Sequence, residues 1–313
     1  MKKGMYEAQV NLHLPGKSSK KDIFMIAIEF HNVSKTFKGK KGASVEAVKD
    51  LNLTIDQGEI FGFLGPNGAG KSTTIKLLMG LIAPSAGQAK IMGTEMGSHR
   101  SRNYVGYLPE NPTFYDYLNA EEYLTFIGKA FGMPDTLISE KIDSNLKLLD
   151  LWDARSRPMR GYSKGMIQRL GLAQAMIHDP DVLILDEPMS GLDPIGRALV
   201  KEIILNLKTK GKCVFFSTHI TADVETVCDR VGILVSGSLQ RVEKVESILT
   251  QGIIGYHLKI RTPGDLQPRE LEISKAELSK IIAETETSGQ EIMFIEPKRK
   301  NLESFFLDIV KGT

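Results

Sequence analysis

Cysteine and long apolar runs are scarce in this chain, and each scarcity excludes a class of protein. Only Cys213 and Cys228 occur in 313 residues, in apolar surroundings and without metal-ligand spacing. We expect both to be buried thiols, with no disulfide framework. No apolar run approaches the ~20 residues that span a bilayer, and the first residues lack the apolar core of a signal peptide. We therefore expect a cytoplasmic chain.

The chain also lacks a strong charge of either sign. Its 40 Lys and Arg residues nearly balance 38 Asp and Glu residues, for a net charge of +2. This excludes the whole-chain basic field that drives general nucleic-acid binding. A content of 42% hydrophobic and 25% charged residues is that of a globular protein. Residues 1–24 are Lys-rich and are expected to be a disordered tail or an overlong start, with a lipid-binding basic arm as the alternative.

What the chain does contain is a glycine-rich loop at residues 65–73, "GPNGAGKST", between a strand-like run and a helix-like run. Three glycines let the chain bend sharply and gather bare N–H groups into a nest for an anion. Lys71 adds a point charge, and Ser72 can reach a magnesium ion from the first turn of the helix. A plain surface turn, the alternative, needs no lysine and hydroxyl at fixed offsets. The P-loop pattern predicts a nucleoside triphosphate site formed by Gly65, Pro66, Asn67, Gly68, Ala69, Gly70, Lys71, Ser72 and Thr73.

Two adjacent acids follow the apolar run "VLIL" at residues 182–185. In a doubly wound sheet the carboxyl end of such a strand faces the phosphate site. There Asp186 can hold magnesium, and Glu187 can polarise the water that attacks the γ-phosphate. Solvated acids at a strand end are the alternative, which the complete P-loop makes the weaker one.

The order of the segments predicts an α/β fold of the P-loop NTPase class. Residues 26–60 read as antiparallel β lead-in, about 111–178 as a helical insertion, and 182–216 as apolar strands around a helix, typical of a parallel sheet covered on both faces. We predict a tail at 1–24, a nucleotide-binding domain at 25–244, and a small C-terminal α+β accessory domain at 245–313. In the last, Ser274 with Glu277 predicts a capping box, and Asn301 predicts a helix cap.

The motifs resemble, in order, those of the ATP-binding cassette (ABC) ATPases over roughly residues 26–240. "GPNGAGKST" and "LILDEP" are similar to that family's two nucleotide motifs, "SGLDP" at 190–194 to its D-loop with Asp193, and "STH" at 217–219 to its switch histidine. Taken alone, His219 would be expected at a helix start or partly buried. The resemblance implies ATP and Mg²⁺ as cofactors, with His219 contacting the γ-phosphate and holding the water of Glu187.

The stretch "YSKGMIQRL" at 162–170 resembles the family's signature but departs from its usual form at Tyr162, Lys164 and Met166. Ser163 and Gly165 are retained, which makes a second anion site at a helix N-terminus. The resemblance implies that Ser163, Lys164, Gly165 and Met166 contact ATP held by another subunit in a head-to-tail dimer. That subunit is a second copy or a related ATPase. A solvated Lys164 is the alternative for that residue.

Two further positions depart from the family pattern. Glu110 stands where the Q-loop glutamine is usual, which keeps an oxygen for magnesium but adds a charge. Phe37 stands where an adenine-stacking tyrosine is usual, and a base needs only a π-face. A core phenylalanine is the alternative for Phe37.

Glu110, the signature and the helix-like "NLESFFLDIV" together resemble ATPase subunits of exporters whose permease is a separate integral-membrane chain. That resemblance implies a place on the inner face of the cell membrane, ATP hydrolysis coupled to export, and no specific nucleic-acid partner. A cytoplasmic ABC ATPase acting as a switch or clamp on ribosomes or DNA is the alternative. A P-loop kinase or GTPase is disfavoured by "YSKGM" and "SGLDP".

Overall fold

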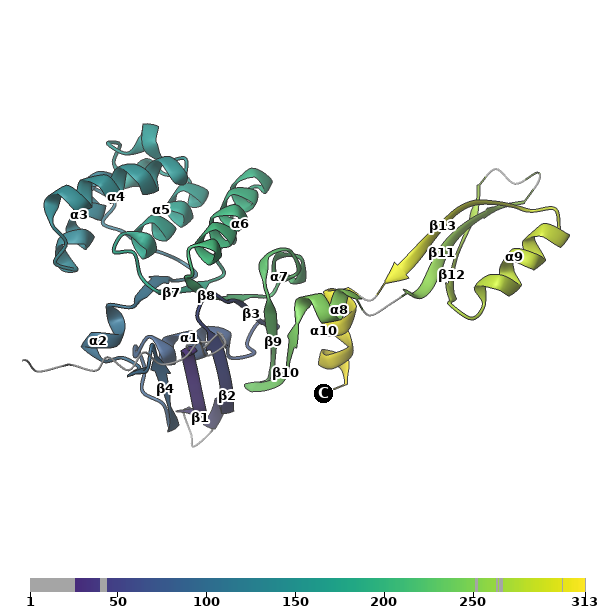
Figure 1. Cartoon of the computed structure of the whole chain (residues 1–313), viewed down its shortest axis with the longest axis horizontal. Coiled ribbons are helices and arrows are strands. Elements are labelled where there is room, and N and C mark those ends of the chain that lie inside the picture. Colours follow the sequence, from purple (N-terminus) through teal and green to yellow (C-terminus); the bar gives the residue numbers. More distant parts are fainter. Residues whose placement is uncertain are drawn as a thin grey trace, which may run out of the picture.

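The computed structural model describes residues 26–39, 44–250, 253–262, 264, 267–299 and 301–312. The predicted tail at 1–24 lies outside them. The described residues form three sheets with helices packed around them (Figure 1). The mixed α/β fold is the one that the sequence predicts.

The first sheet is antiparallel and holds β2 (Ser44–Asp56), β1 (Ile26–Lys38), β4 (Ala86–Ile91) and β5 (Thr94–Glu95), in that order. Ile28 and Phe30 on β1 and Leu51 on β2 turn one face of the sheet into the core. This is the predicted β lead-in, but β4 and β5, which follow the P-loop helix in the chain, also belong to it and were not predicted from the sequence.

The second sheet has the order β10 (Ser238–Lys244), β9 (Arg230–Val235), β3 (Ile60–Leu64), β8 (Cys213–Thr218), β7 (Val182–Asp186) and β6 (Val105–Leu108). Its strands are parallel except β10. Because side chains alternate along a strand, Phe61 and Phe215 enter one core and Leu64 and Phe216 the other. The sheet is therefore buried on both faces, as predicted, and its carboxyl ends meet at one edge.

Helices cover the two faces differently. α1 (Lys71–Leu78) and the first sheet cover one face, while α6 (Pro194–Thr209) and α7 (Thr221–Val227) cover the other. Both cysteines are free thiols, and burial raises the pKa of each. Among the described residues, no helix combines the length and the apolar character that crossing a membrane requires.

The helical insertion contains α3 (Ala120–Ala130), α4 (Asp135–Leu148), two short 3₁₀ turns (Trp152–Ala154 and Met159–Gly161) and α5 (Lys164–Met176), after the short α2 (His99–Arg102). Asn119 and Glu122 form a capping box at the start of α3. Tyr123, Leu146 and Leu170 are buried where the three long helices meet. The insertion lies where the sequence predicts helices.

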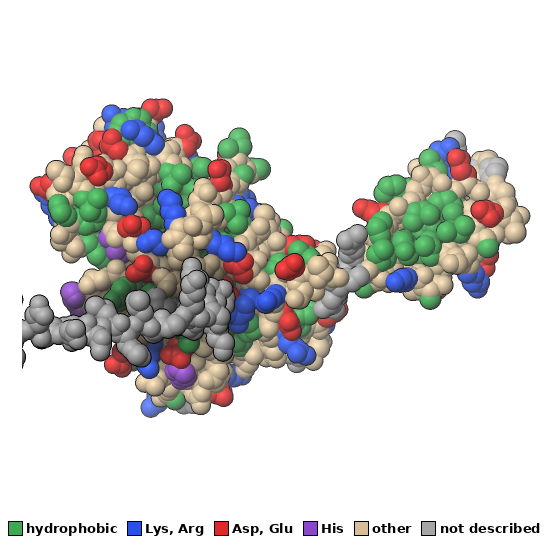
Figure 2. Space-filling model, in the orientation of Figure 1, with side chains coloured by type: hydrophobic (Ala, Val, Ile, Leu, Met, Phe, Trp, Pro, Cys, Tyr) green, Lys and Arg blue, Asp and Glu red, His purple; other side chains and the backbone are tan. Residues whose placement is uncertain are grey.

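A third, antiparallel sheet holds β12 (Arg269–Ser274), β11 (Ile253–Arg261) and β13 (Glu291–Arg299), with α9 (Leu278–Thr287) packed on it. We call these residues, 253–299, the small-sheet module. Figure 1 shows the module standing apart from the rest of the chain, and Figure 2 shows apolar side chains gathered on it. Ile254, Met293 and Ile295 are exposed there.

The helices on either side of the module, α8 (Val245–Thr250) and α10 (Leu302–Lys311), do not pack on the module's sheet. α10 contacts α7 and α8, and α8 contacts β10. Val245, Ile248 and Leu302 are buried in the core that holds Val224 of α7. The sequence predicts residues 245–313 as one accessory unit, whereas the module is inserted between two helices of the main body. An apolar stripe in the sequence shows that a helix buries one face, but it does not show which part of the protein that face packs against.

The two predicted caps have different outcomes. Asn301 does cap α10, since its side-chain oxygen accepts the Ser304 N–H at 2.8 Å. The capping box at Ser274 is wrong, because Glu277 accepts both the N–H and the hydroxyl of Ser274 and the helix begins only at Leu278.

Candidate nucleotide site

The P-loop connects β3 to α1 and is held closely by its neighbours. Gly68 and Gly70 have φ angles of 80° and 108°, which residues with a side chain rarely adopt. A Cβ on Gly70 would lie 2.3 Å from the Ala47 carbonyl oxygen, and one on Gly65 would lie 2.5 Å from the carbonyl oxygen of Leu234. Only glycine fits at these positions, because the loop backbone lies directly against β2 and β9.

A cavity of about 690 Å³ opens over this loop. Its volume lies in the range of small-molecule sites. The cavity is lined by β2, by the P-loop with the start of α1, by two acids, and by the turn between β9 and β10. The lining residues are Val45, Glu46, Ala47, Lys49, Asn67, Gly68, Ala69, Gly70, Lys71, Ser72, Thr73, Glu110, Glu187, Ser236 and Gly237. The predicted loop residues from Asn67 to Thr73 therefore share one cavity, whereas Gly65 and Pro66 do not line it.

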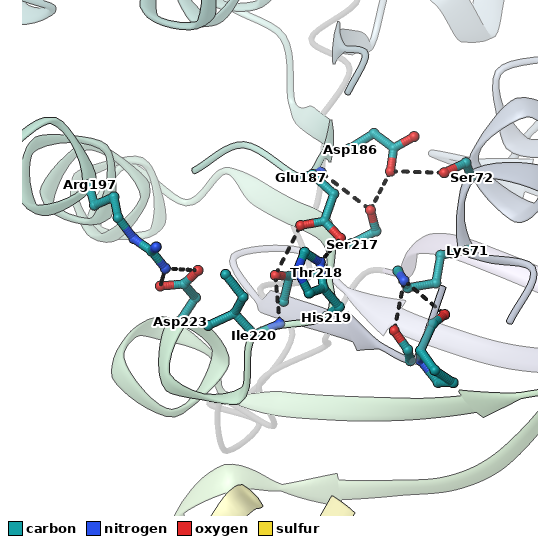
Figure 3. Close-up of polar contacts among 12 residues, drawn as sticks. Lys71, Ser72, Asp186, Glu187, Arg197, Ser217, Thr218, His219, Ile220 and Asp223 are labelled. Carbon is teal, nitrogen blue, oxygen red and sulfur yellow. Dashed lines mark hydrogen bonds and ion pairs between the residues drawn. The ribbon is translucent and has the colours of Figure 1, made fainter. Parts of the chain in front are cut away.

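Lys71 is 7% exposed and folds back onto its own loop. Its Nζ donates to the carbonyl oxygens of Gly65 at 2.7 Å and Pro66 at 3.2 Å (Figure 3). Burial lowers the pKa of Lys71, and the nearby carboxylates of Glu187, Asp186 and Glu110 oppose that shift. The site thus keeps a desolvated cation among acids, so an anionic ligand would need a cation such as Mg²⁺ beside the carboxylates as well as Lys71.

Asp186 is 3% exposed and accepts two hydroxyls on Oδ1. The Ser72 hydroxyl donates at 3.3 Å from the start of α1, and the Ser217 hydroxyl donates from the end of β8 (Figure 3). The sequence predicts Ser72 and Asp186 as magnesium ligands, and the fold brings their oxygens together.

The Glu187 carboxylate is held at both oxygens. Nδ1 of His219 lies 2.8 Å from Oε1, and the Thr218 hydroxyl donates to Oε2 at 3.3 Å (Figure 3). Glu187 also has a φ of 49°, in the left-handed region that costs free energy for a residue other than glycine. Such strain is typical of functional sites, and the fold brings Glu187 and His219, the predicted catalytic pair, within hydrogen-bonding distance.

Magnesium fits the donors that are present. Among the described residues no cluster of three or more His, Cys, Asp or Glu side chains could hold a metal by itself. Mg²⁺ does not need one, because it is usually bound by one or two carboxylates together with substrate phosphates and waters. Ser72 and Asp186 meet that requirement beside the cavity, and Glu110 lines the same cavity from an exposed position.

The predicted signature does not line the cavity of its own chain. Ser163 caps α5 by accepting the Met166 N–H at 3.2 Å, and Ser163 and Lys164 are exposed. The Lys164 side chain lies against Gly191 of the D-loop. Asp193 also lies outside the cavity and caps α6 by accepting the Gly196 N–H at 2.8 Å.

Phe37 does not line the cavity either. It is 42% exposed, with Lys35 Nζ 5.1 Å from the centre of its ring, so the core alternative is wrong. It pairs with Val45 on the neighbouring strand, and Val45 does line the cavity. The adenine-stacking role of Phe37 stays a prediction.

Several residues around the site are not among those predicted from the sequence. Ser217 and Thr218 follow four apolar strand residues, so the rule that placed Asp186 at the sheet edge could have placed these hydroxyls there too. Gln168 is 3% exposed, and its Nε2 lies 3.2 Å from the carbonyl oxygen of Glu187. No local pattern marks this glutamine, because its partner is close only in the folded chain.

Comparison with known proteins agrees with this geometry. A family model described as "ABC transporter" matches residues 48–190. The chain is 50% identical over 197 residues to the ABC transporter ATP-binding protein sll0415 of Synechocystis sp., covering 62% of this chain and 56% of that protein. The match thus spans little more than half of that relative's length.

Two other matches extend further. The ABC transporter ATP-binding protein YhcH of Bacillus subtilis is 33% identical over 302 residues, covering 91% of this chain and 96% of YhcH. A solved structure, an ATP-binding subunit of an ABC transporter, is 31% identical with a TM-score of 0.66, covering 72% of this chain and 92% of its own. The chain belongs to the family of ABC transporter ATP-binding proteins.

Proposed function

We propose that this chain binds ATP with Mg²⁺ in the P-loop cavity and hydrolyses it as the ATPase subunit of an ABC transporter. One observation carries the proposal: the Glu187 carboxylate is fixed between His219 and Thr218, at the wall of a cavity that also holds Lys71. A carboxylate held this way beside a phosphate nest is arranged to deprotonate a water.

The residues have separate roles in this mechanism. Backbone N–H groups of the P-loop and the Lys71 charge bind the phosphate oxygens. Ser72, Asp186 and Glu110 would hold Mg²⁺, which supplies positive charge to the phosphates when it is bound. Glu187 orients and deprotonates the attacking water, while His219 fixes that carboxylate and contacts the γ-phosphate.

The remaining predicted contacts act on another subunit in this proposal. Ser163, Lys164, Gly165, Met166 and Asp193 lie outside their own chain's cavity, and Ser163 is exposed at the start of α5. The N-terminus of α5, with its backbone N–H groups and helix dipole, suits a phosphate held by a second copy or a related ATPase subunit. Two ATP molecules would then be shared in a head-to-tail dimer.

An aromatic hollow on the helical insertion suits a permease segment. Thr113, Phe114, Tyr115, Tyr123 and Phe126 line a depression of about 440 Å³. Tyr115 and Phe126 are each 56% exposed, as is usual for aromatic anchors of an interface. Thr113 follows Glu110 by three residues, so a segment bound here would contact the stretch of chain that leads from the nucleotide cavity. We propose a separate permease chain, attachment at the inner face of the membrane, and export.

The test of the proposal is phosphate release by the purified chain with ATP and Mg²⁺. Glu187→Gln should reduce turnover by at least 100-fold while ATP affinity stays within a few-fold, because the base is removed and the phosphate contacts remain. A Glu187→Gln turnover within a few-fold of the parent's would refute this role of Glu187.

A further inference from the structure

A buried glutamine connects the signature helix to the backbone of Glu187. Gln168 lies on α5, is 3% exposed, and donates from Nε2 to the carbonyl oxygens of Glu187 and Pro188, each at 3.2 Å. Both partners are carbonyl acceptors, so the amide must present its NH₂ group, whose two hydrogens match two acceptors. The contact thus joins α5 to the residue that follows β7.

The backbone of Glu187 is fixed on both sides. Its N–H donates to the Ser217 carbonyl oxygen at 3.1 Å, and its own carbonyl accepts the Ser190 N–H at 3.0 Å besides the Gln168 amide. With a φ of 49°, this residue depends on such contacts to keep its conformation. A shift of the Gln168 amide would therefore move the peptide that carries the catalytic carboxylate.

The first turn of the same helix carries the signature. Ser163 caps α5, and Gln168 lies five residues later, which is about 7.5 Å along an α-helix. A short helix moves as a unit, so a displacement of its first turn is carried to Gln168. The residues between Ser163 and Gln168 are all helical, so no loop separates the two positions.

We propose that Gln168 is a positioning residue that transmits ATP contact at Ser163 and Gly165 to Glu187 of the same chain. This inference rests on the proposed shared-site dimer. There the signature contacts the ATP held by the other subunit, whereas Glu187 acts on the ATP of its own subunit. Gln168 thus couples the two ATP sites and makes hydrolysis at one depend on occupancy of the other.

The test compares two glutamines on α5. Gln168→Met keeps the side-chain length and removes both donors. Gln174→Met is the matched control, because Gln174 accepts the Tyr123 hydroxyl at 2.8 Å inside the helical insertion and does not contact Glu187. For Gln168→Met we expect at least a 10-fold loss of turnover, ATP affinity within two-fold of the parent, and a Hill coefficient that falls from above 1 to about 1. Gln174→Met should keep the parent's turnover and Hill coefficient.

A second measurement separates positioning from simple damage to α5. With ATP and Mg²⁺, the Gln168→Met chain should accumulate as a dimer in size-exclusion with light scattering, since ATP still bridges the subunits and is not consumed. Loss of both turnover and dimer would show a merely structural role and overturn the inference. If Gln168→Met does not fold, Gln168→Asn is measured in the same way, because it keeps the amide but shortens its reach.

The remaining outcomes are distinct. A Gln168→Met chain with the parent's turnover and Hill coefficient overturns the inference and leaves the proposed function standing. A parent chain that hydrolyses ATP with a Hill coefficient of 1 does the same. A parent chain that binds no ATP refutes the proposed function itself.

Discussion

Nδ1 of His219 lies 2.8 Å from Oε1 of Glu187, although the two residues are 32 positions apart in the chain. Each follows the carboxyl end of a parallel strand, β8 and β7, and the pairing of those strands brings them together. The histidine side chain is 49% exposed and the glutamate side chain 10% exposed. The carboxylate is therefore held from the solvent side by a group that reaches over it.

We expect His219→Ala to reduce ATP turnover about 10- to 100-fold, because the Glu187 carboxylate keeps only its Thr218 contact, while ATP affinity falls at most a few-fold with the loss of one γ-phosphate contact. His31→Ala is the control, since His31 pairs with Glu29 at 2.9 Å on β1, outside the cavity lining. Phosphate release and an ATP titration measure both quantities. Equal turnover in the two variants would contradict the assigned role of His219.

The Glu187→Gln chain should form a stable dimer with ATP and Mg²⁺, while the parent without ATP stays monomeric or weakly associated. Adding Ser163→Arg should remove that dimer and spare nucleotide binding, because a long cation blocks close approach of the signature. The control substitution Ser144→Arg, at an exposed position of α4, should leave the dimer in place. Size-exclusion with light scattering decides, and a Glu187→Gln chain that binds ATP yet stays monomeric would count against shared sites.

Lys71→Met should weaken ATP binding by about 10- to 100-fold, since it removes charge-assisted hydrogen bonds to phosphate. Without ATP, by contrast, the same substitution should not destabilise the fold. Burial lowers the pKa of Lys71, so the folded chain holds this cation at a cost, which an uncharged side chain of similar length avoids. We expect a melting temperature no lower than the parent's without ATP. A melting temperature lower by several degrees would show that Lys71 stabilises the loop.

Replacing residues 251–300 with a short Gly/Ser linker should leave ATP binding intact, because none of the module residues that the structure describes lines the cavity. Ending the chain after residue 244 should instead lower the melting temperature, because it removes the buried residues of α8 and uncovers the face of α7 that α10 contacts. Leu302 alone, fully buried, contributes roughly 1.5–3 kcal/mol. Calorimetry and an ATP titration on the two truncated chains make the comparison. Equal stability would contradict the packing of α10 on the main body.

His178 should make the fold sensitive to mild acid. Its ring stacks on Phe131, Nε2 lies 3.1 Å from the Val105 carbonyl oxygen, and Nδ1 has no partner among the described residues. Burial lowers its pKa from 6.5 to about 4. As the pH falls, the unfolded chain therefore binds this proton at a higher pH than the folded chain does. The contribution of neutral His178 to the free energy of unfolding is complete above pH 6.5 and is lost as the pH falls toward 4.

Between pH 7 and pH 5 the loss amounts to about 2 kcal/mol of the free energy of unfolding. His178→Phe keeps the stacking and cannot titrate, so its urea-denaturation midpoint should fall less over that interval. The hydrogen bond that the variant lacks lowers stability equally at both pH values. Parallel pH dependence of the two chains would rule out His178 as the cause.

The sequence predicted the parts of the site that local chemistry determines. Glycine positions and the lysine of the P-loop, and two acids after an apolar strand, are specified by spacing within a few residues. The contacts that hold Glu187 were predicted less well, because Thr218 and Gln168 reach it only through the pairing of β7 with β8 and the packing of α5. Phe37 shows the same limit, since β-strand pattern alone did not reveal that it is exposed.

The place of α10 has a consequence for how the chain is made. Proteins emerge from the ribosome from the N-terminus, and domains generally begin to fold during synthesis. Because α10 follows the small-sheet module in the chain, α8 is made about 50 residues, and α7 about 75 residues, before the helix that covers them. Their apolar face stays open to chaperones and to other nascent chains during that interval, so the length and folding speed of the module set how long an unfinished ATPase is exposed to misassembly.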